Sequence, residues 1–192
     1  NAVCAVELWN PLDNHSEGGM IKATDAIFRN NAKAIHALNY TNYIPTTGNE
    51  AEYVSSFRNC SFIIDSNYMG EEMFNEHVEL QNVKGIDFHG CSFSVDSTVS
   101  QVSSTSHGIK AIDAGFEVSF YCSNFTITPC PEEDFTRSSF SGFETAIYVV
   151  NSGQQARIFT VRSTDFTNNV KGIYAQNTGY ATITDSDFYV GA

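Results

Sequence analysis

The chain has 192 residues, a length typical of one domain. It carries 22 acidic and 10 basic side chains, so its formal net charge is −12, which argues against binding to nucleic acids or anionic membranes. No run of about 18 apolar residues occurs, which argues against a membrane-spanning helix. The 15 Phe and 9 Tyr residues, with only 4 Pro, favour an all-β protein of short strands and polar turns.

A repeat centred on phenylalanine runs along the chain. The six anchors are Phe28, Phe62, Phe93, Phe125, Phe166 and Phe188. Two residues before each anchor is a small residue: Ala26, Cys60, Cys91, Ser123, Thr164 or Ser186. Five residues before it is Ala23, Phe57, Phe88, Phe120, Val161 or Ile183. The two-residue spacing is typical of strands, and the three-residue step between −5 and −2 predicts a bend that keeps the apolar side chains facing inward.

A further strand precedes each pair. The stretch 78–82 aligns without a gap with 173–177, and 6–10 is a third copy. Asn10, Asn82 and Asn177 close these copies, at positions where Asn readily adopts a left-handed conformation. An amphipathic helix over Ala23–Leu38 is the alternative, because Ala, Lys and Leu favour helices. The matching stretch 166–175 is a poor helix and a fair strand, so we predict strands in both.

The anchors lie 34, 31, 32, 41 and 22 residues apart. The shortest interval is about one turn of a parallel β-helix, and the longer ones are one turn plus an insertion. The expected insertions are Asn39–Glu52, Ser66–Glu76, Ser97–Ser106 and Thr128–Ser141. The sequence therefore predicts a right-handed parallel β-helix (solenoid) of about six coils with long loop insertions, as a single domain over 1–192. Neither end resembles a cap, so we expect a piece of a longer solenoid that adjoins further coils or domains.

The five cysteines are an odd number. Cys60 and Cys91 are predicted to be buried, reduced neighbours on the row of small residues. Cys122 and Cys130 are predicted to form a disulfide that closes a short loop. A Cys60–Cys91 bond is the alternative, because stacked coils bring Cα atoms within disulfide range. Cys4 is left over, and a preceding coil could supply its partner.

Four stretches resemble the large secreted right-handed parallel β-helix proteins of Bacteroidota, which are cargo of the type IX secretion system. They are GGMIKATDAIFRNNAKAIHA, FRNCSF, HVELQNVKGIDFHGCSF and GIYAQNTGYATITDSDF, and the resemblance covers nearly the whole chain. It implies export and either cell-surface display or release. It supplies no catalytic residues, and the chain shows no sorting domain of that family.

Catalysis has to be weighed, because parallel β-helices include many polysaccharide lyases and hydrolases. The chain has no Asp-Asp pair, and His89-Gly90 and His107-Gly108 each lack the preceding Gly of a polygalacturonase motif. Asp65 and Asp96, on successive coils, are one candidate carboxylate set, and 165–187 contains another in Asp165, Asp185 and Asp187. We expect both to be solvated turn or outer-face carboxylates, so no catalytic residue is assigned.

Metal and cofactor sites are not expected. No His-x-x-x-His or Cys-x-x-Cys spacing occurs, which argues against zinc. Ca²⁺ bound by Asp carboxylates and loop carbonyls is the alternative, and Asp185-Ser186-Asp187 is the nearest fragment of such a motif.

Aromatic residues in loops or at outward positions are the candidate ligand-binding residues, because exposed rings stack on sugars. They are Trp9, Tyr40, Tyr43, Tyr68, Tyr174 and Tyr180. The alternative is that they cover the sheet faces and the bases of the loops. We therefore predict a non-enzymatic, structural or adhesin-like β-helix, secreted or at the bacterial cell surface, that presents loops to a neutral glycan or a protein. Nucleic-acid binding and membrane insertion are not expected, and a carbohydrate-active hydrolase or lyase of the pectin-lyase-like fold is the alternative function.

Overall fold

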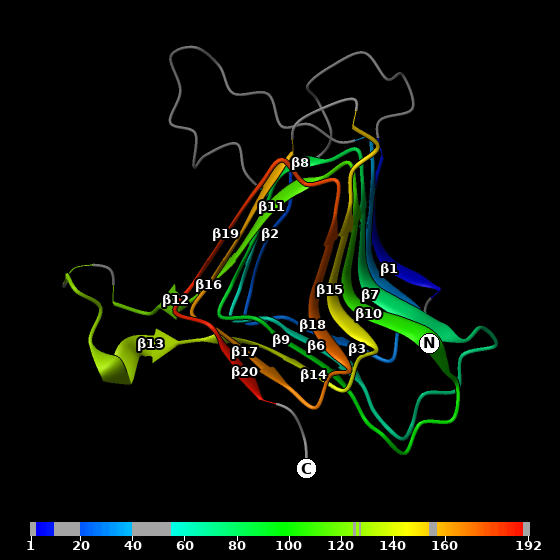
Figure 1. The fold of residues 1–192 in the computed structure, drawn as a ribbon. Helices are drawn as coiled ribbons and strands as arrows, with labels where there is room; N and C mark the ends of the chain where they lie inside the picture. The colour runs from blue at the N-terminus through cyan, green and yellow to red at the C-terminus, as the bar shows by residue number, and fades with distance from the viewer. Residues whose placement is uncertain are drawn as a thin grey trace.

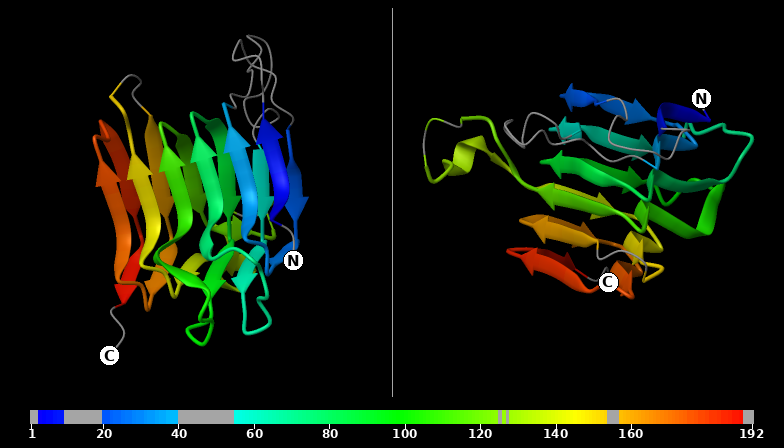
Figure 2. Two further views of the ribbon diagram at one scale, coloured as in Figure 1. Left: turned by 90° about the vertical axis from the view of Figure 1, so that its right-hand side faces the viewer. Right: turned by 90° about the horizontal axis from the view of Figure 1, so that it is seen from above.

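The computed structural model describes residues 3–9, 20–39, 55–124, 126, 128–153 and 157–189. Its strands form three six-stranded parallel sheets, so the all-β prediction is confirmed. Viewed along the direction of stacking, the three sheets enclose a triangular core (Figure 1). From the side, the strands of each sheet lie next to one another in a regular row (Figure 2).

The chain visits the three sheets in a fixed order, and we call one such circuit a coil. Sheet 1 contains β1 (Cys4–Trp9), β4 (Lys33–Leu38), β7 (Phe74–Gln81), β10 (Val102–Ile112), β15 (Thr145–Val150) and β18 (Lys171–Gln176). Sheet 2 contains β2 (Lys22–Thr24), β5 (Ser55–Arg58), β8 (Lys84–His89), β11 (Gly115–Ser119), β16 (Ile158–Arg162) and β19 (Tyr180–Thr184). Sheet 3 contains β3 (Ile27–Arg29), β6 (Ser61–Ile64), β9 (Ser92–Val95), β14 (Ser138–Ser141), β17 (Thr164–Thr167) and β20 (Asp187–Tyr189).

Residues 22–38 form three strands, β2, β3 and β4, so the helical alternative for this stretch is wrong. The bends between sheets are made by residues in the left-handed region, which Asn and Asp tolerate better than other L-residues. Asn82 and Asn177, expected in this conformation, have φ of 52° and 55°. Asn10 lies outside the described residues.

A row of stacked phenylalanines runs along the inner face of sheet 3. Successive ring centroids are 4.5 to 5.3 Å apart, and the rings are nearly parallel. The row consists of Phe28, Phe62, Phe93, Phe140, Phe166 and Phe188. The predicted anchor Phe125 is therefore wrong, because Phe140 occupies that position; Phe125 itself lies outside the described residues.

The same error shifted the neighbouring predictions. Ser138, not Ser123, belongs to the row of small residues, where its hydroxyl accepts from the Cys91 amide and donates to the Ser119 carbonyl. Val118, not Phe120, pairs with Phe88 and Val161 in sheet 2. Both candidate anchors close a Ser-x-Phe triplet, so spacing alone could not separate them. Phe140 is identified as the anchor because it pairs with Phe93 and Phe166 and is fully buried.

The predicted insertion at 128–141 is misplaced for this reason. The excursion leaves the stack after β11 and ends before β14, and an antiparallel pair of short strands closes it, β12 (Tyr121–Cys122) and β13 (Phe135–Thr136). Phe120 lies at its base and stacks on Phe135 with centroids 4.5 Å apart. The predicted insertions 66–76 and 97–106 are shorter than expected, because β7 begins at Phe74 and β10 at Val102, and these two residues pair.

Three free cysteines and one disulfide are present in the described residues. Cys122 and Cys130, the pair expected from the sequence, are joined across the base of the excursion. Cys60 and Cys91 are free and buried, and Cys4 is free and half-buried. Burial raises the pKa of the Cys91 thiol, which suits a side chain that fills space in the row of small residues.

Candidate functional site

The outer face of sheet 1 carries one polar or aromatic side chain per coil, in register. Sheet 1 strands alternate, so Val78, Ile109 and Ile147 point into the core while the residues that follow them point outward. The outward row, which we call the sheet 1 ladder, is Glu7, His36, Glu79, Lys110, Tyr148 and Tyr174. It therefore changes from charged to aromatic along the direction of stacking.

The charged half of the sheet 1 ladder is a network of ion pairs. Lys33 contacts Glu79 and lies 3.1 Å from Glu76, and Lys110 lies 3.2 Å from Glu79 and 3.9 Å from Glu76. His36 lies beside these pairs, 3.4 Å from Glu79 and 3.6 Å from Glu7. Two ammonium groups and two carboxylates thus neutralise each other at this point.

The network changes the pKa of its members. Burial raises the pKa of Glu79, but the ammonium groups of Lys33 and Lys110 outweigh it and hold that pKa below its usual value. Burial lowers the pKa of Lys33, and the two glutamates outweigh it and raise that pKa. Glu79 and Lys33 therefore stay charged and paired over the neutral pH range.

The aromatic half of the sheet 1 ladder, Tyr148 and Tyr174, is extended to a stack of three rings by His107, which lies in the neighbouring row with Thr145 and Glu76. His107 lies on Tyr148 with centroids 4.8 Å apart, and Tyr148 lies on Tyr174 at 5.1 Å, each pair being 8° from parallel. Burial lowers the pKa of His107, so the imidazole is neutral at physiological pH. Its buried Nδ1 has no hydrogen-bond partner among the described residues. The stack presents ring edges and two phenol groups beside the ion-pair network.

The predicted ligand-binding aromatics do not gather in one place. Tyr174 belongs to the stack, Trp9 is 58% exposed at the end of β1, and Tyr180 is 62% exposed on sheet 2. Tyr68 is buried, so its predicted exposure is wrong: its ring packs across Gly70, which has no side chain, and its hydroxyl donates to the Glu72 carbonyl at 2.8 Å. Tyr40 and Tyr43 lie outside the described residues.

Sequence reasoning missed Tyr148, although the signal was present. The stretch 145–151 repeats the Ile-Tyr pair and the closing Asn of 171–177, so Tyr148 aligns with Tyr174. It weighed His107 only as part of a His-Gly motif, and it missed the network formed by two lysines and two glutamates. No local pattern marks those residues, because they meet only when 33, 76 and 110 are stacked on neighbouring coils.

The carboxylates proposed as a first catalytic set serve the turns. Asp65 accepts hydrogen bonds from Asn30, Asn67 and Arg29, and the Asn30 amide is the largest cause of its lowered pKa. Asp96 accepts from the amide and hydroxyl of Thr98, and the amide lowers its pKa most. A lowered pKa suits a carboxylate that stays ionised and orders a turn.

The second set surrounds one arginine. Arg137 contacts Asp165 at 2.8 Å and Asp187 at 2.7 Å, and donates to the Asp185 carbonyl at 2.9 Å. This side chain leaves the base of the excursion and ties it to the last two described coils. Asp165 and Asp187 therefore face a guanidinium group rather than each other.

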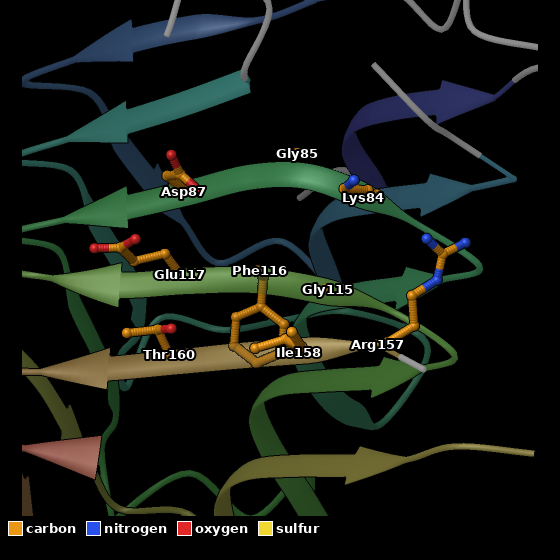
Figure 3. A pocket seen from close by; sticks show the side chains of 9 residues that line it. All are labelled: Lys84, Gly85, Asp87, Gly115, Phe116, Glu117, Arg157, Ile158 and Thr160. Atoms are coloured by element: carbon orange, nitrogen blue, oxygen red, sulfur yellow. The ribbon is translucent and has the colours of Figure 1, made fainter. Parts of the chain in front are cut away.

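A groove of about 460 Å³ runs across the outer face of sheet 2 (Figure 3). Lys84 and Arg157 lie at one end, and Asp87, Glu117 and Thr160 lie at the other. Between the two ends, the outer face has no side chain at Gly85 and Gly115. We call this the sheet 2 groove.

No group of three or more His, Cys, Asp or Glu side chains that could hold a metal ion occurs among the described residues. Within that same part of the chain, no helix is long and apolar enough to cross a membrane. Comparisons of the chain with protein-family models, with curated proteins and with solved structures found no match.

Proposed function

We propose that this protein is an exported, non-enzymatic right-handed parallel β-helix that binds a neutral glycan along the outer face of sheet 1. The proposed β-helix architecture is supported by the three parallel sheets, which the chain visits in constant order. Connections between parallel strands of one sheet are right-handed in nearly all proteins, which supports the handedness. A solenoid of this kind offers a long, regular face and suits a structural or adhesin-like role.

The sheet 1 ladder is the observation that carries the binding proposal. A linear polymer lying along the direction of stacking would meet one ladder side chain per coil, about 4.8 Å apart. The aromatic stack of His107, Tyr148 and Tyr174 supplies apolar ring edges and phenol groups for sugar hydroxyls. The adjoining ion pairs supply charged donors and acceptors without a local excess of either sign.

The charge of the protein is the reason for proposing a neutral glycan as the ligand. The network on sheet 1 is balanced, while the whole chain has a net charge of −12. A polyanionic glycan would be repelled over about a Debye length, roughly 8 Å at physiological salt. Binding to a neutral glycan should therefore depend weakly on salt.

Export is supported by the Cys122–Cys130 disulfide, because disulfides persist mainly in oxidising compartments outside the cytosol. The resemblance to secreted β-helix proteins of Bacteroidota points the same way. We place the protein outside the cell, secreted or at the cell surface, with a glycan or a glycosylated protein as its partner.

A panel of immobilised neutral polysaccharides, with polygalacturonate as the acidic comparison, tests the proposal. We expect saturable binding to at least one neutral polymer, and a loss of about tenfold or more in Tyr148→Ala and Tyr174→Ala, since a stacked aromatic contact contributes about 1–3 kcal/mol. Tyr189→Ala, which removes an exposed ring on sheet 3, is the matched control and should bind as the parent does. Equal losses in all three variants, or preference for polygalacturonate, would contradict the proposal.

A carbohydrate-active enzyme is the second candidate. Asp87 and Glu117 lie directly opposite each other on adjacent strands of sheet 2, and paired carboxylates are the machinery of glycoside hydrolysis. The same panel should therefore be analysed for released reducing ends and unsaturated products. Products that disappear in Asp87→Asn and Glu117→Gln would favour the enzyme over the binding protein.

A further inference from the structure

We propose that the sheet 2 groove binds a small zwitterion of tripeptide length, with its carboxylate at Lys84 and Arg157 and its ammonium group at Asp87 and Glu117. The groove lies on a different sheet from the proposed glycan face, so failure of the glycan proposal would not affect this one. Neither end of the groove is used by the glycan binding proposed for sheet 1, although Asp87 and Glu117 are also the carboxylates of the second candidate function.

The floor of the groove is built for close approach. Lys84 pairs with Gly115 and Ile86 pairs with Phe116, so Gly85 is an extra residue in β8, a bulge with φ of 84°. On the next coil, a Cβ atom at Gly115 would lie 3.0 Å from the carbonyl oxygen of Ile158. Gly115 thereby allows the close approach of the Ile158 backbone, and together with the bulge at Gly85 it leaves the floor of the groove without side chains.

The acidic end holds two like charges side by side. Asp87 and Glu117 are register partners on adjacent parallel strands, where like charges destabilise each other. Among the ion pairs of the described residues, Asp87 takes part in one, with His89 at 3.8 Å, and Glu117 takes part in none. A bound cationic group between the two carboxylates would remove this repulsion.

The basic end mirrors this arrangement. Figure 3 shows Lys84 and Arg157 on the same side of the groove, opposite the carboxylates. Arg157 donates to the Asn82 side chain at 3.2 Å, but its buried Nε atom has no hydrogen-bond partner among the described residues. Within those residues, neither cation forms an ion pair. An unpartnered guanidinium donor beside an ammonium group favours a carboxylate.

The length of the groove selects the ligand. Arg157 lies three residues before Thr160, the register partner of Glu117, so the basic and acidic ends are separated by about 10 Å at 3.3 Å per residue. An extended tripeptide has about the same span between its charged ends. The exposed Ile158 side chain borders the groove between the ends and can contact the middle of such a ligand.

The test titrates the whole chain with triglycine, followed by amide chemical shifts. N-acetyl-triglycine keeps only the carboxylate, triglycine amide keeps only the ammonium group, and free glycine keeps both but is too short. We expect triglycine to bind saturably with shifts confined to β8, β11 and β16. Each of the other three compounds should bind at least tenfold more weakly.

Two pairs of variants assign the ends. Arg157→Gln and Glu117→Gln should each weaken triglycine binding about tenfold, whereas the matched controls Arg162→Gln, on β16, and Glu133→Gln, in the excursion, should leave it unchanged. In the double variant Asp87→Asn/Glu117→Gln, triglycine and N-acetyl-triglycine should bind with nearly equal affinity, because both partners of the ammonium group are gone. Absence of saturable triglycine binding, equal binding of all four compounds to the parent chain, or equal effects of variants and controls would overturn the proposal.

Discussion

The outer faces of sheets 1 and 2 belong to the same coils but arrange charge in opposite ways. On sheet 1, Glu79 lies beside Lys110 on the next coil, and the two form an ion pair. On sheet 2, Asp87 lies beside Glu117 on the next coil, and the like charges face each other. In a stack of parallel strands, each outward residue is placed about 4.8 Å from its counterpart, so the order of charges from coil to coil decides between attraction and repulsion. The ion pair on sheet 1 thereby compensates its own charges, whereas the like charges on sheet 2 leave a repulsion that the proposed zwitterionic ligand would relieve.

The largest expected effect tests whether one core supports both faces. Phe93 is buried and stacks between Phe62 and Phe140. Phe93→Ala should lower the free energy of unfolding by about 3–5 kcal/mol, because it leaves a cavity in the middle of the row. Urea unfolding followed by circular dichroism measures it.

Phe188→Ala is the matched control in the same row. Its ring is 51% exposed and stacks on Phe166, so we expect about half the effect or less. Equal losses in the two variants would mean that the row is not a continuous core shared by the coils that carry both faces.

Acid should affect sheet 1 before sheet 2. His77, on β7, is buried among the rings of Phe62, Phe74 and Phe93. Burial lowers the pKa of this histidine from 6.5 to about 4. The unfolded chain binds this proton at a higher pH than the folded chain, so stability is complete above pH 6.5 and falls by up to about 3 kcal/mol as the pH approaches 4. Hydrogen exchange at pH 7 and pH 4.5 should show greater loss of protection in sheet 1.

His77→Leu removes this proton and is the control for that prediction. Between pH 6.5 and 4.5 its unfolding free energy should fall clearly less than that of the parent chain, and His107, whose pKa burial also lowers, contributes to the fall that remains. Below that range Glu79 contributes too, because a lowered carboxyl pKa gives stability that is lost as the pH falls through the folded value. A parent chain with flat stability from pH 7 to pH 4 would contradict the assignment of His77.

The smallest expected effect is the difference in stability between a charge removed from sheet 1 and a charge removed from sheet 2. Glu79→Gln leaves Lys33 and Lys110 short of a partner in a half-buried network, and we expect a loss of about 1–2 kcal/mol. Glu117→Gln removes one of two like charges, and it should be neutral or stabilise the chain by up to about 0.5 kcal/mol. Thermal unfolding at low and high salt measures both, and the difference should shrink as salt screens the charges. Equal losses would show that the two faces do not differ in their electrostatics.

The repeat itself could be predicted because its signals are local. The alternation in 173–176 and its copies predicted β1, β7 and β18, and their pairing partners align as expected. The row of phenylalanines was predicted at five of its six positions. The failure at Phe125 arose because Ser123 and Ser138 each precede a Phe by two residues, so the local pattern occurs twice around one excursion.

The candidate site was less predictable for a related reason. Alternation along one strand marks Tyr174 and Glu117 as outward residues, but it does not say which side chain of the next coil lies beside them. Which residue becomes that partner depends on the lengths of the insertions between the strands. The entropic cost of closing a loop grows only slowly with its length, so the length of an insertion says little about the register. The pairing of Glu79 with Lys110, of Asp87 with Glu117 and of Tyr148 with Tyr174 is settled by burial of all the inward rows at once. Local spacing thus sets which face each side chain occupies, whereas the non-local packing of whole coils sets which side chains meet, and the two faces owe their different charge patterns to the second.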